Sequence, residues 1–126
     1  MNLNSETSKP IYIQIAEWIE TEILKGHFKQ DEKVYSQYKL AEIFTINPAT
    51  AAKGLNVLSD EKILYNKRGL GKFVASQAIE RIRDKRKNVV LKRLIIELVD
   101  EAEQLQVSEP ELIAMLQEYK KEGEKK

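Results

Sequence analysis

The first strong pattern in the chain is a set of apolar residues at helical spacing. They lie three or four positions apart and are Ile11, Ile15, Trp18, Ile19 and Ile23. This spacing places them on one face and predicts an amphipathic helix. Pro10 suits the first turn and Gly26 the C-terminal end, so the helix is expected over residues 10–25, followed by a polar connection over residues 27–35.

Two shorter helices are predicted next, on either side of a tight break at residues 45–47. Ser36 can cap the first, which covers residues 36–44. Asn47 and Pro48 open the second, because asparagine accepts hydrogen bonds from the free first-turn N–H groups and proline has no N–H to leave unpaired. Two helices at this spacing are typical of a helix-turn-helix.

A hairpin pattern follows the second of these helices. Residues 63–65 and 73–75 predict two short antiparallel strands. The residues between them, 66–72, include three cations and two glycines. Glycine permits positive φ, while Lys and Arg bind phosphates or enter a minor groove. Basic turns are common, but directly behind a helix-turn-helix this hairpin predicts the wing of a winged helix-turn-helix domain, expected over residues 9–76.

The remainder of the chain has the pattern of a helical hairpin. A long helix is predicted from Gln77 to about Leu105, with a basic first half and an apolar, acidic second half. Ser108 and Glu111 form a capping-box pattern at the start of a final helix, so this tail is expected over residues 77–121. The expected fold class is therefore mainly α with a minor β part, a winged helix-turn-helix followed by a two-helix dimerisation hairpin.

The apolar face of this hairpin needs a partner. Two helices cannot enclose a core by themselves, so they must pack on the N-terminal domain, on a second copy, or on both. We expect a second copy, because two winged domains on a two-fold axis would read a two-fold DNA site with half-sites about 34–36 Å or a multiple apart. The expected dimer interface consists of Leu91, Leu94, Ile95, Leu98, Val99, Ala102, Leu105, Leu112, Ile113 and Leu116.

Charge is unevenly distributed along the chain, although the formal net charge is only +1. Residues 1–93 contain 17 basic and 11 acidic side chains, whereas residues 94–126 contain 4 basic and 9 acidic ones. Nucleic-acid binding needs a local positive face rather than a high overall pI. The distribution therefore favours DNA binding by the first part of the chain.

Composition argues against several other classes of protein. The chain has no cysteine, which excludes disulfides and thiolate metal sites. No apolar run reaches membrane-spanning length and residues 1–6 lack a signal-peptide pattern, so we expect a cytoplasmic protein with no membrane partner. There is no Ser/His/Asp or Cys/His set and no metal-ligand cluster, and the Gly69-Leu70-Gly71 segment lacks the strand-to-helix setting of a phosphate loop. We expect no enzyme activity and no cofactor.

Four ordered blocks of the sequence resemble the GntR family of bacterial transcription regulators. They cover residues 9–15, 40–42, 46–50 and 68–74. The resemblance implies a winged domain that binds DNA, and residues 97–113 are similar to the short two-helix tail of the YtrA branch. That tail implies dimerisation, and members of the branch often control transporter operons. Tyr38 stands where the family commonly has a DNA-contacting arginine, and Leu70 where the wing commonly has a basic residue.

These patterns together predict a homodimeric, sequence-specific DNA-binding transcription regulator that acts as a repressor. The third helix would enter the major groove by its N-terminal end, while the second helix and the wing would bind the backbone. The expected DNA contacts are Ser36, Gln37, Tyr38, Lys39, Asn47, Pro48, Ala49, Thr50, Ala52, Lys53, Lys67, Arg68, Gly69 and Lys72. The alternative is a winged helix that binds protein instead of DNA, and a small-molecule effector at the junction of the long helix with the DNA-binding domain is left open.

Overall fold

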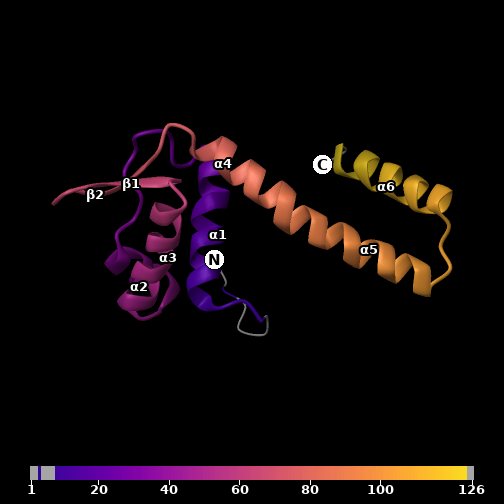
Figure 1. Ribbon diagram of the computed structural model, residues 1–126, viewed down its shortest axis with the longest axis horizontal. Helices are drawn as coiled ribbons and strands as arrows, with labels where there is room; N and C mark the ends of the chain where they lie inside the picture. The colour runs from indigo at the N-terminus through magenta and orange to yellow at the C-terminus, as the bar shows by residue number, and fades with distance from the viewer. Residues whose placement is uncertain (1–2, 4–7, 125–126) are drawn as a thin grey trace. The chain divides into compact units, whose positions relative to one another are not determined.

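The computed structural model describes residue 3 and residues 8–124 of the 126-residue chain. It consists of two compact units, Met1–Asp84 and Lys85–Lys126, whose helices and strands are labelled in Figure 1. The N-terminal residues considered for a signal peptide lie outside the described residues, except for Leu3. Leu3 packs on the core of the first unit.

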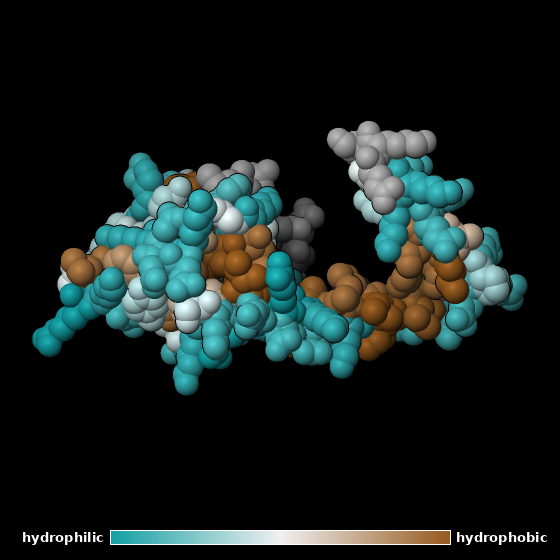
Figure 2. Space-filling view, turned by 90° about the horizontal axis from the view of Figure 1, so that it is seen from above, coloured by the Kyte–Doolittle hydropathy of each residue, from teal (hydrophilic) through white to brown (hydrophobic). Residues whose placement is uncertain are grey.

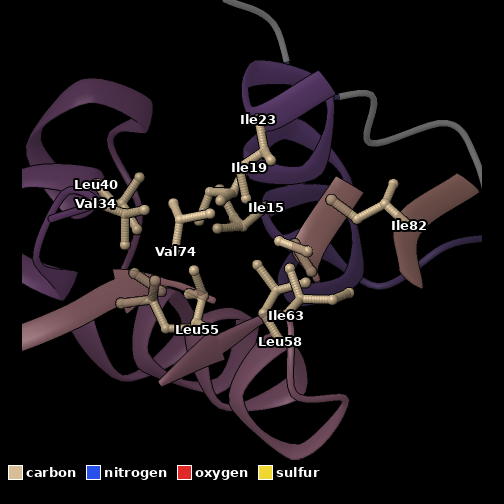
Figure 3. Packing of buried hydrophobic residues seen from close by; sticks show 14 residues of the cluster. Ile15, Ile19, Ile23, Val34, Leu40, Leu55, Leu58, Ile63, Val74 and Ile82 are labelled. Carbon is tan, nitrogen blue, oxygen red and sulfur yellow. The ribbon is translucent and has the colours of Figure 1, made fainter. Parts of the chain in front are cut away.

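Three helices build the first unit: α1 (Ile11–Leu24), α2 (Gln37–Phe44) and α3 (Pro48–Asp60). The predicted apolar face of α1 is the centre of the core, because Ile15, Ile19 and Ile23 are almost fully buried. Figure 3 shows Ile15, Ile19 and Val74 in the middle of this cluster. Each fully buried Leu or Ile side chain contributes roughly 1.5–3 kcal/mol relative to an exposed one. The helix-turn-helix therefore rests on a rigid base.

The ends of α2 and α3 follow the capping signals in the sequence. The Ser36 Oγ accepts a hydrogen bond from the N–H of Lys39 at 3.1 Å, and the Asn47 Oδ1 accepts one from the N–H of Ala49 at 2.8 Å. Between the two helices, Thr45 adopts a left-handed conformation with φ 54°. This residue reverses the chain, so that only three residues separate the end of α2 from the start of α3.

The wing consists of β1 (Leu64–Lys67) and β2 (Gly71–Val74), paired antiparallel with Tyr65 opposite Phe73 and Asn66 opposite Lys72. The segment predicted as a polar connection also pairs with this hairpin. The N–H of Asp31 donates to the Val74 carbonyl at 2.8 Å, and the N–H of Val34 donates to the Lys72 carbonyl at 3.0 Å. Part of the connection thus pairs with β2 through an isolated bridge between Lys33 and Phe73.

The first unit continues beyond the wing into α4 (Ala78–Lys85). Ala78 and Ile82 are buried in the same core. The compact unit therefore reaches Asp84, whereas the sequence placed the start of the tail at residue 77.

The second unit contains η1 (Arg86–Leu91), α5 (Lys92–Gln104) and α6 (Glu109–Glu124). The single long helix expected up to residue 105 thus includes one π-helical segment, η1. Two hydrogen bonds end α5, from the N–H of Gln106 to the Glu103 carbonyl and from the N–H of Val107 to the Ala102 carbonyl. This is a Schellman arrangement with a left-handed glutamine where glycine is usual.

The start of α6 follows the predicted capping box. The Ser108 Oγ accepts a hydrogen bond from the N–H of Glu111 at 3.3 Å. A short connection with a defined geometry therefore joins the two helices of the tail.

The apolar side chains of the second unit remain mostly on its surface. Of the ten residues expected at a dimer interface, Ala102 is buried, Leu112 is half-buried and the other eight are exposed. Figure 2 shows hydrophobic side chains gathered over the helices of this unit. Within the part of the chain that the structure describes, no helix combines the length and the apolar character needed to cross a membrane.

Candidate nucleic-acid interface

One face of α3 is buried and the other is open to solvent. Ala51, Gly54, Leu55 and Leu58 pack into the core, where they fix the helix on α1 and α2. The residues predicted to enter a major groove lie at the free end, where Asn47 and Ala49 are exposed while Pro48, Thr50 and Ala52 are half-buried. The small side chains at this end would allow the helix backbone to approach base edges closely.

The exposed face of α3 extends further than the sequence analysis predicted. Ala49, Lys53 and Asn56 are all exposed and lie at i, i+4 and i+7 spacing, so they share one side of the helix. Asn56 was missing from the predicted contacts, although this spacing could have indicated it. Asparagine is able to read adenine through two hydrogen bonds, which makes Asn56 a candidate base contact.

Lys53 is held in place by an aromatic ring. Its Nζ lies 4.1 Å from the centroid of the Tyr12 ring on α1. A cation–π contact of this kind is worth roughly 0.5–1 kcal/mol at an exposed site. A phosphate could therefore draw Lys53 away at modest cost.

The N-terminal end of α2 combines a structural residue with exposed ones. Ser36 uses its oxygen to cap the helix, as described above, and Gln37 is half-buried. Tyr38 is 70% exposed, and Lys39 is exposed with its Nζ 4.0 Å from a carboxylate oxygen of Glu42. Tyr38 and Lys39 are thus the side chains of this helix end that are most available to a ligand.

The strand register divides the cations of the wing between its two faces. Lys67 lies on the face of Tyr65 and Phe73, with its Nζ 4.7 Å from the centroid of the Phe73 ring. Lys72 lies on the opposite face, together with its partner Asn66. The sequence alone grouped Lys67, Arg68 and Lys72 as one basic loop, and the structure brings only Lys67 and Arg68 to the tip.

Lys72 is engaged within the first unit. Its Nζ donates hydrogen bonds to the Ser59 Oγ at 2.8 Å and to the Asn66 Oδ1 at 2.7 Å. Burial lowers the pKa of Lys72, and attraction to Asp60 opposes this shift. Lys72 therefore fastens the wing to the C-terminal end of α3, in addition to any contact with DNA.

The tip of the wing is a tight turn. The N–H of Leu70 donates to the Lys67 carbonyl at 2.9 Å, and Gly69 between them has φ 78°. Arg68 and Gly69 are exposed, and Leu70 is 60% exposed. The turn therefore presents one guanidinium and one apolar side chain at its end.

Lys33 is a further cation at the base of the wing that the sequence analysis missed. It forms an isolated bridge with Phe73, and its side chain lies over Gly71. A Cβ added at Gly71 would lie 2.8 Å from the Lys33 Cε. Because Gly71 has no side chain, the Lys33 side chain can extend across this position without a steric clash.

A hollow of about 170 Å³ lies between the start of α2 and the base of the wing. Its polar lining includes Lys33, Ser36, Gln37, Tyr38 and Lys72. The fold thus brings three of the contacts predicted for α2 together with one from the wing. No local pattern in the sequence places Lys33 beside them, because the bridge to Phe73 joins residues far apart in the chain.

The described residues hold no group of three or more His, Asp or Glu side chains that could bind a metal ion. The exposed features of the first unit are the N-terminal end of α3, the N-terminal end of α2 and a basic wing. These are the parts of a winged helix-turn-helix.

Comparison with known proteins places this architecture in a family. No protein-family model matches the chain. The repressor YtrA of Bacillus subtilis is 31% identical over 100 residues, which cover 77% of this chain and 77% of YtrA. The chain belongs to the GntR family of transcriptional regulators.

Other relatives match over different lengths. The repressor NagR of Bacillus subtilis is 36% identical over 80 residues, covering 64% of this regulator but only 33% of NagR. This GntR-family chain therefore spans about a third of NagR and about three quarters of YtrA.

Solved structures agree with the fold. A GntR-family regulator from Bacteroides thetaiotaomicron has 31% sequence identity and a TM-score of 0.76, covering 90% of this chain and 99% of that one. The DNA-binding domain of AraR in complex with operator ORE1 has 32% identity and a TM-score of 0.53. It covers 59% of this regulator and 90% of the AraR chain.

Proposed function

We propose that this GntR-family regulator is a sequence-specific DNA-binding repressor. One observation supports this most strongly: the exposed ends of α3 and α2 and the basic wing tip all belong to one compact unit. The same fold is found in the AraR domain with its operator, and the related YtrA and NagR are repressors. We further propose that it works in the cytoplasm, because that is where a repressor of this kind meets its operator.

The proposed contacts differ in what they recognise. Ala49, Thr50 and Asn56 on the exposed side of α3 would meet base edges, with the alanine available to a thymine methyl. Lys39, Lys67 and Arg68 would bind phosphates, and Arg68 with Gly69 would lie near the minor groove. Phosphate contacts set the position on the duplex, while the α3 residues set the sequence.

We also propose that Lys33 takes part in this interface. It lies at the base of the wing and lines the same hollow as Ser36, Gln37 and Tyr38. A cation beside the first turn of a helix favours a phosphate there, because the free N–H groups of that turn also attract negative charge.

The proposed assembly is a homodimer through the tail. The exposed apolar side chains of α5 and α6 form a surface that is unfavourable in water. A second copy could cover it and place two winged units on one two-fold DNA site. In this proposal the tail functions as a dimerisation element and residues 9–76 as the DNA-binding element.

A salt titration tests the DNA-binding proposal. Fluorescence anisotropy would measure the affinity for DNA from upstream of the protein's own gene, at salt concentrations between 50 and 200 mM. If the dimer neutralises six to ten phosphates, the affinity should fall by roughly 10³–10⁵ over this range. An affinity that does not depend on salt would contradict the proposal and favour a protein-binding winged helix.

The variant Arg68→Ala tests the wing in the same assay. Loss of one phosphate contact in each subunit of the dimer should weaken binding to all sequences alike and reduce the salt slope by about two. Lys25→Ala is a suitable control, because Lys25 is an exposed cation at the C-terminal end of α1. Equal affinities of both variants would remove the wing tip from the interface.

The regulated genes can be identified by sequencing the DNA fragments that the protein binds. The similarity of the tail to that of YtrA supports a transporter operon as the target. Enrichment of fragments upstream of transporter genes is the expected result, and enrichment elsewhere would contradict this part of the proposal.

A further inference from the structure

A second concave site lies in the first unit, away from the residues proposed to read DNA. It is a cavity of about 400 Å³ at the C-terminal end of α3, bounded by β1 and by the residues that lead into α4. Small-molecule sites in proteins commonly measure about 300–1,000 Å³. The cavity is therefore large enough for a small ligand.

The lining of this cavity is polar and positively charged. Lys62 and Arg81 both border it, and no carboxylate is among its lining residues. The neutral polar side chains around them come from Ser59, Asn66, Ser76 and Gln77. Cations together with hydroxyl and amide groups are the donors that bind phosphate and carboxylate groups.

A third cation lies directly behind this lining. The Lys72 Nζ is hydrogen-bonded to Ser59 and Asn66, both of which border the cavity. Asp60 is the acid that acts electrostatically on Lys72. Asp31, which accepts the hydrogen bond of the lining residue Tyr65, is a second carboxylate close to the cavity. Three cations against these two carboxylates leave an excess of positive charge at this site.

The position of the cavity separates it from the proposed DNA contacts. Ser59 is near the last residue of α3, whereas Asn47 and Ala49 are at the first turn. A helix of 13 residues is about 20 Å long. A duplex held by the N-terminal end of α3 would therefore leave the cavity at the other end free for a different molecule.

We propose that this cavity binds a small phosphate-bearing molecule that acts as an effector. Lys62 and Arg81 would hold its phosphate, with hydrogen bonds from Ser76 or Gln77. This inference goes beyond DNA binding, because the site is separate from the operator contacts. Lys72 and Asn66 belong to the wing strands, so an anion that attracts the Lys72 ammonium alters the bonds that fasten the wing to α3.

Binding is tested by isothermal titration calorimetry on the full chain without DNA. The probes are inorganic phosphate, pyrophosphate and glucose 6-phosphate, each at an ionic strength matched with sodium chloride. Saturable binding of at least one probe is expected. Absence of saturable binding by all three would overturn the proposal, without any bearing on whether the protein binds DNA.

The double variant Lys62→Gln/Arg81→Gln should weaken probe binding by roughly tenfold or more, because two charge-assisted hydrogen bonds are lost. Arg83→Gln is the control for the Arg81 change: it removes one positive charge from the same helix, but Arg83 does not border this cavity. Both Lys62 and Arg81 are exposed, so the fold should tolerate the changes. Equal weakening in the double variant and the control would overturn the site.

A DNA titration distinguishes a small molecule from a DNA phosphate as the source of the anion. The double variant should keep the operator affinity of the wild type. If it lost as much DNA affinity as Arg68→Ala, the cavity would be part of the DNA interface and the effector proposal would be wrong.

Discussion

Gly54 of α3 lies directly against the main chain of Tyr12 in α1. A Cβ added at Gly54 would lie 2.8 Å from the Tyr12 carbonyl oxygen and 3.1 Å from the Ile15 Cγ2. The two helices therefore pack closely, with backbone against backbone at this point. The same contact region holds Lys53 over the Tyr12 ring, so it orients a proposed DNA contact as well as the core.

Gly54→Ala should lower the free energy of unfolding. Alanine favours a helix over glycine by about 1 kcal/mol, but the new methyl group collides with rigid backbone, and such overpacking costs about 1–3 kcal/mol. Urea unfolding measures the difference. Gly123→Ala in α6 is the control, because nothing lies within 4 Å of its added Cβ, and it should leave the stability unchanged or slightly raised. If the Gly54→Ala protein were as stable as the control, α1 and α3 would be able to move apart and accommodate the methyl group without loss of stability.

Lys33→Ala should weaken operator binding without unfolding the domain. The exposed lysine makes its bridge to Phe73 through the backbone, so alanine keeps the pairing and removes the charge. Loss of one phosphate contact in each subunit of the dimer should lower the affinity and reduce the salt slope by about two. Lys29→Ala on the same connection is the matched control, as Lys29 is also exposed. Wild-type affinity of Lys33→Ala would exclude this residue from the interface.

Leu98→Glu should convert the proposed dimer into monomers. Leu98 is 50% exposed and lies in the middle of the apolar side of α5, where a buried carboxylate without a partner is strongly unfavourable. Light scattering after size exclusion measures the mass. Ile96→Glu is the control: Ile96 is 61% exposed, but two positions along a helix turn it to another side. A stable dimer of the Leu98→Glu protein would place the interface elsewhere.

Tyr65 should titrate above its ordinary pKa of 10.0. Its hydroxyl donates a hydrogen bond to the Asp31 Oδ1 at 2.7 Å, and this bond, followed by desolvation and by repulsion between the carboxylate and a phenolate, raises the pKa. The contribution to folding is complete below pH 10.0 and is lost as the pH rises through the raised value, because the unfolded chain releases its proton first.

A spectrophotometric titration of tyrosine ionisation measures this shift, with Tyr65→Phe identifying the signal of Tyr65. Asp31→Asn should return the pKa of Tyr65 toward 10.0. Asparagine suits the left-handed conformation of Asp31, whose φ is 67°. Unchanged titration in Asp31→Asn would show that this carboxylate does not act on Tyr65.

Short sequence patterns predicted most of the helices and strands of this fold. Ser36, Asn47 and Ser108 cap the helices that they were predicted to cap, because a capping bond joins residues two or three positions apart. The π-helical segment at Arg86–Leu91 was not predicted, since the apolar residues around it keep the ordinary α-helical period.

The sequence by itself determined the helix-turn-helix, the wing and the apolar face of the tail, because each depends on spacing, caps and turns within a few residues. It also determined the family, through the order of these elements. Only the tertiary structure decided that Lys33 joins the wing, that Lys72 fastens it to Ser59, and that Lys62 and Arg81 border one cavity. Those contacts join residues distant in the chain, and their geometry follows from the packing of a whole core rather than from any local pattern.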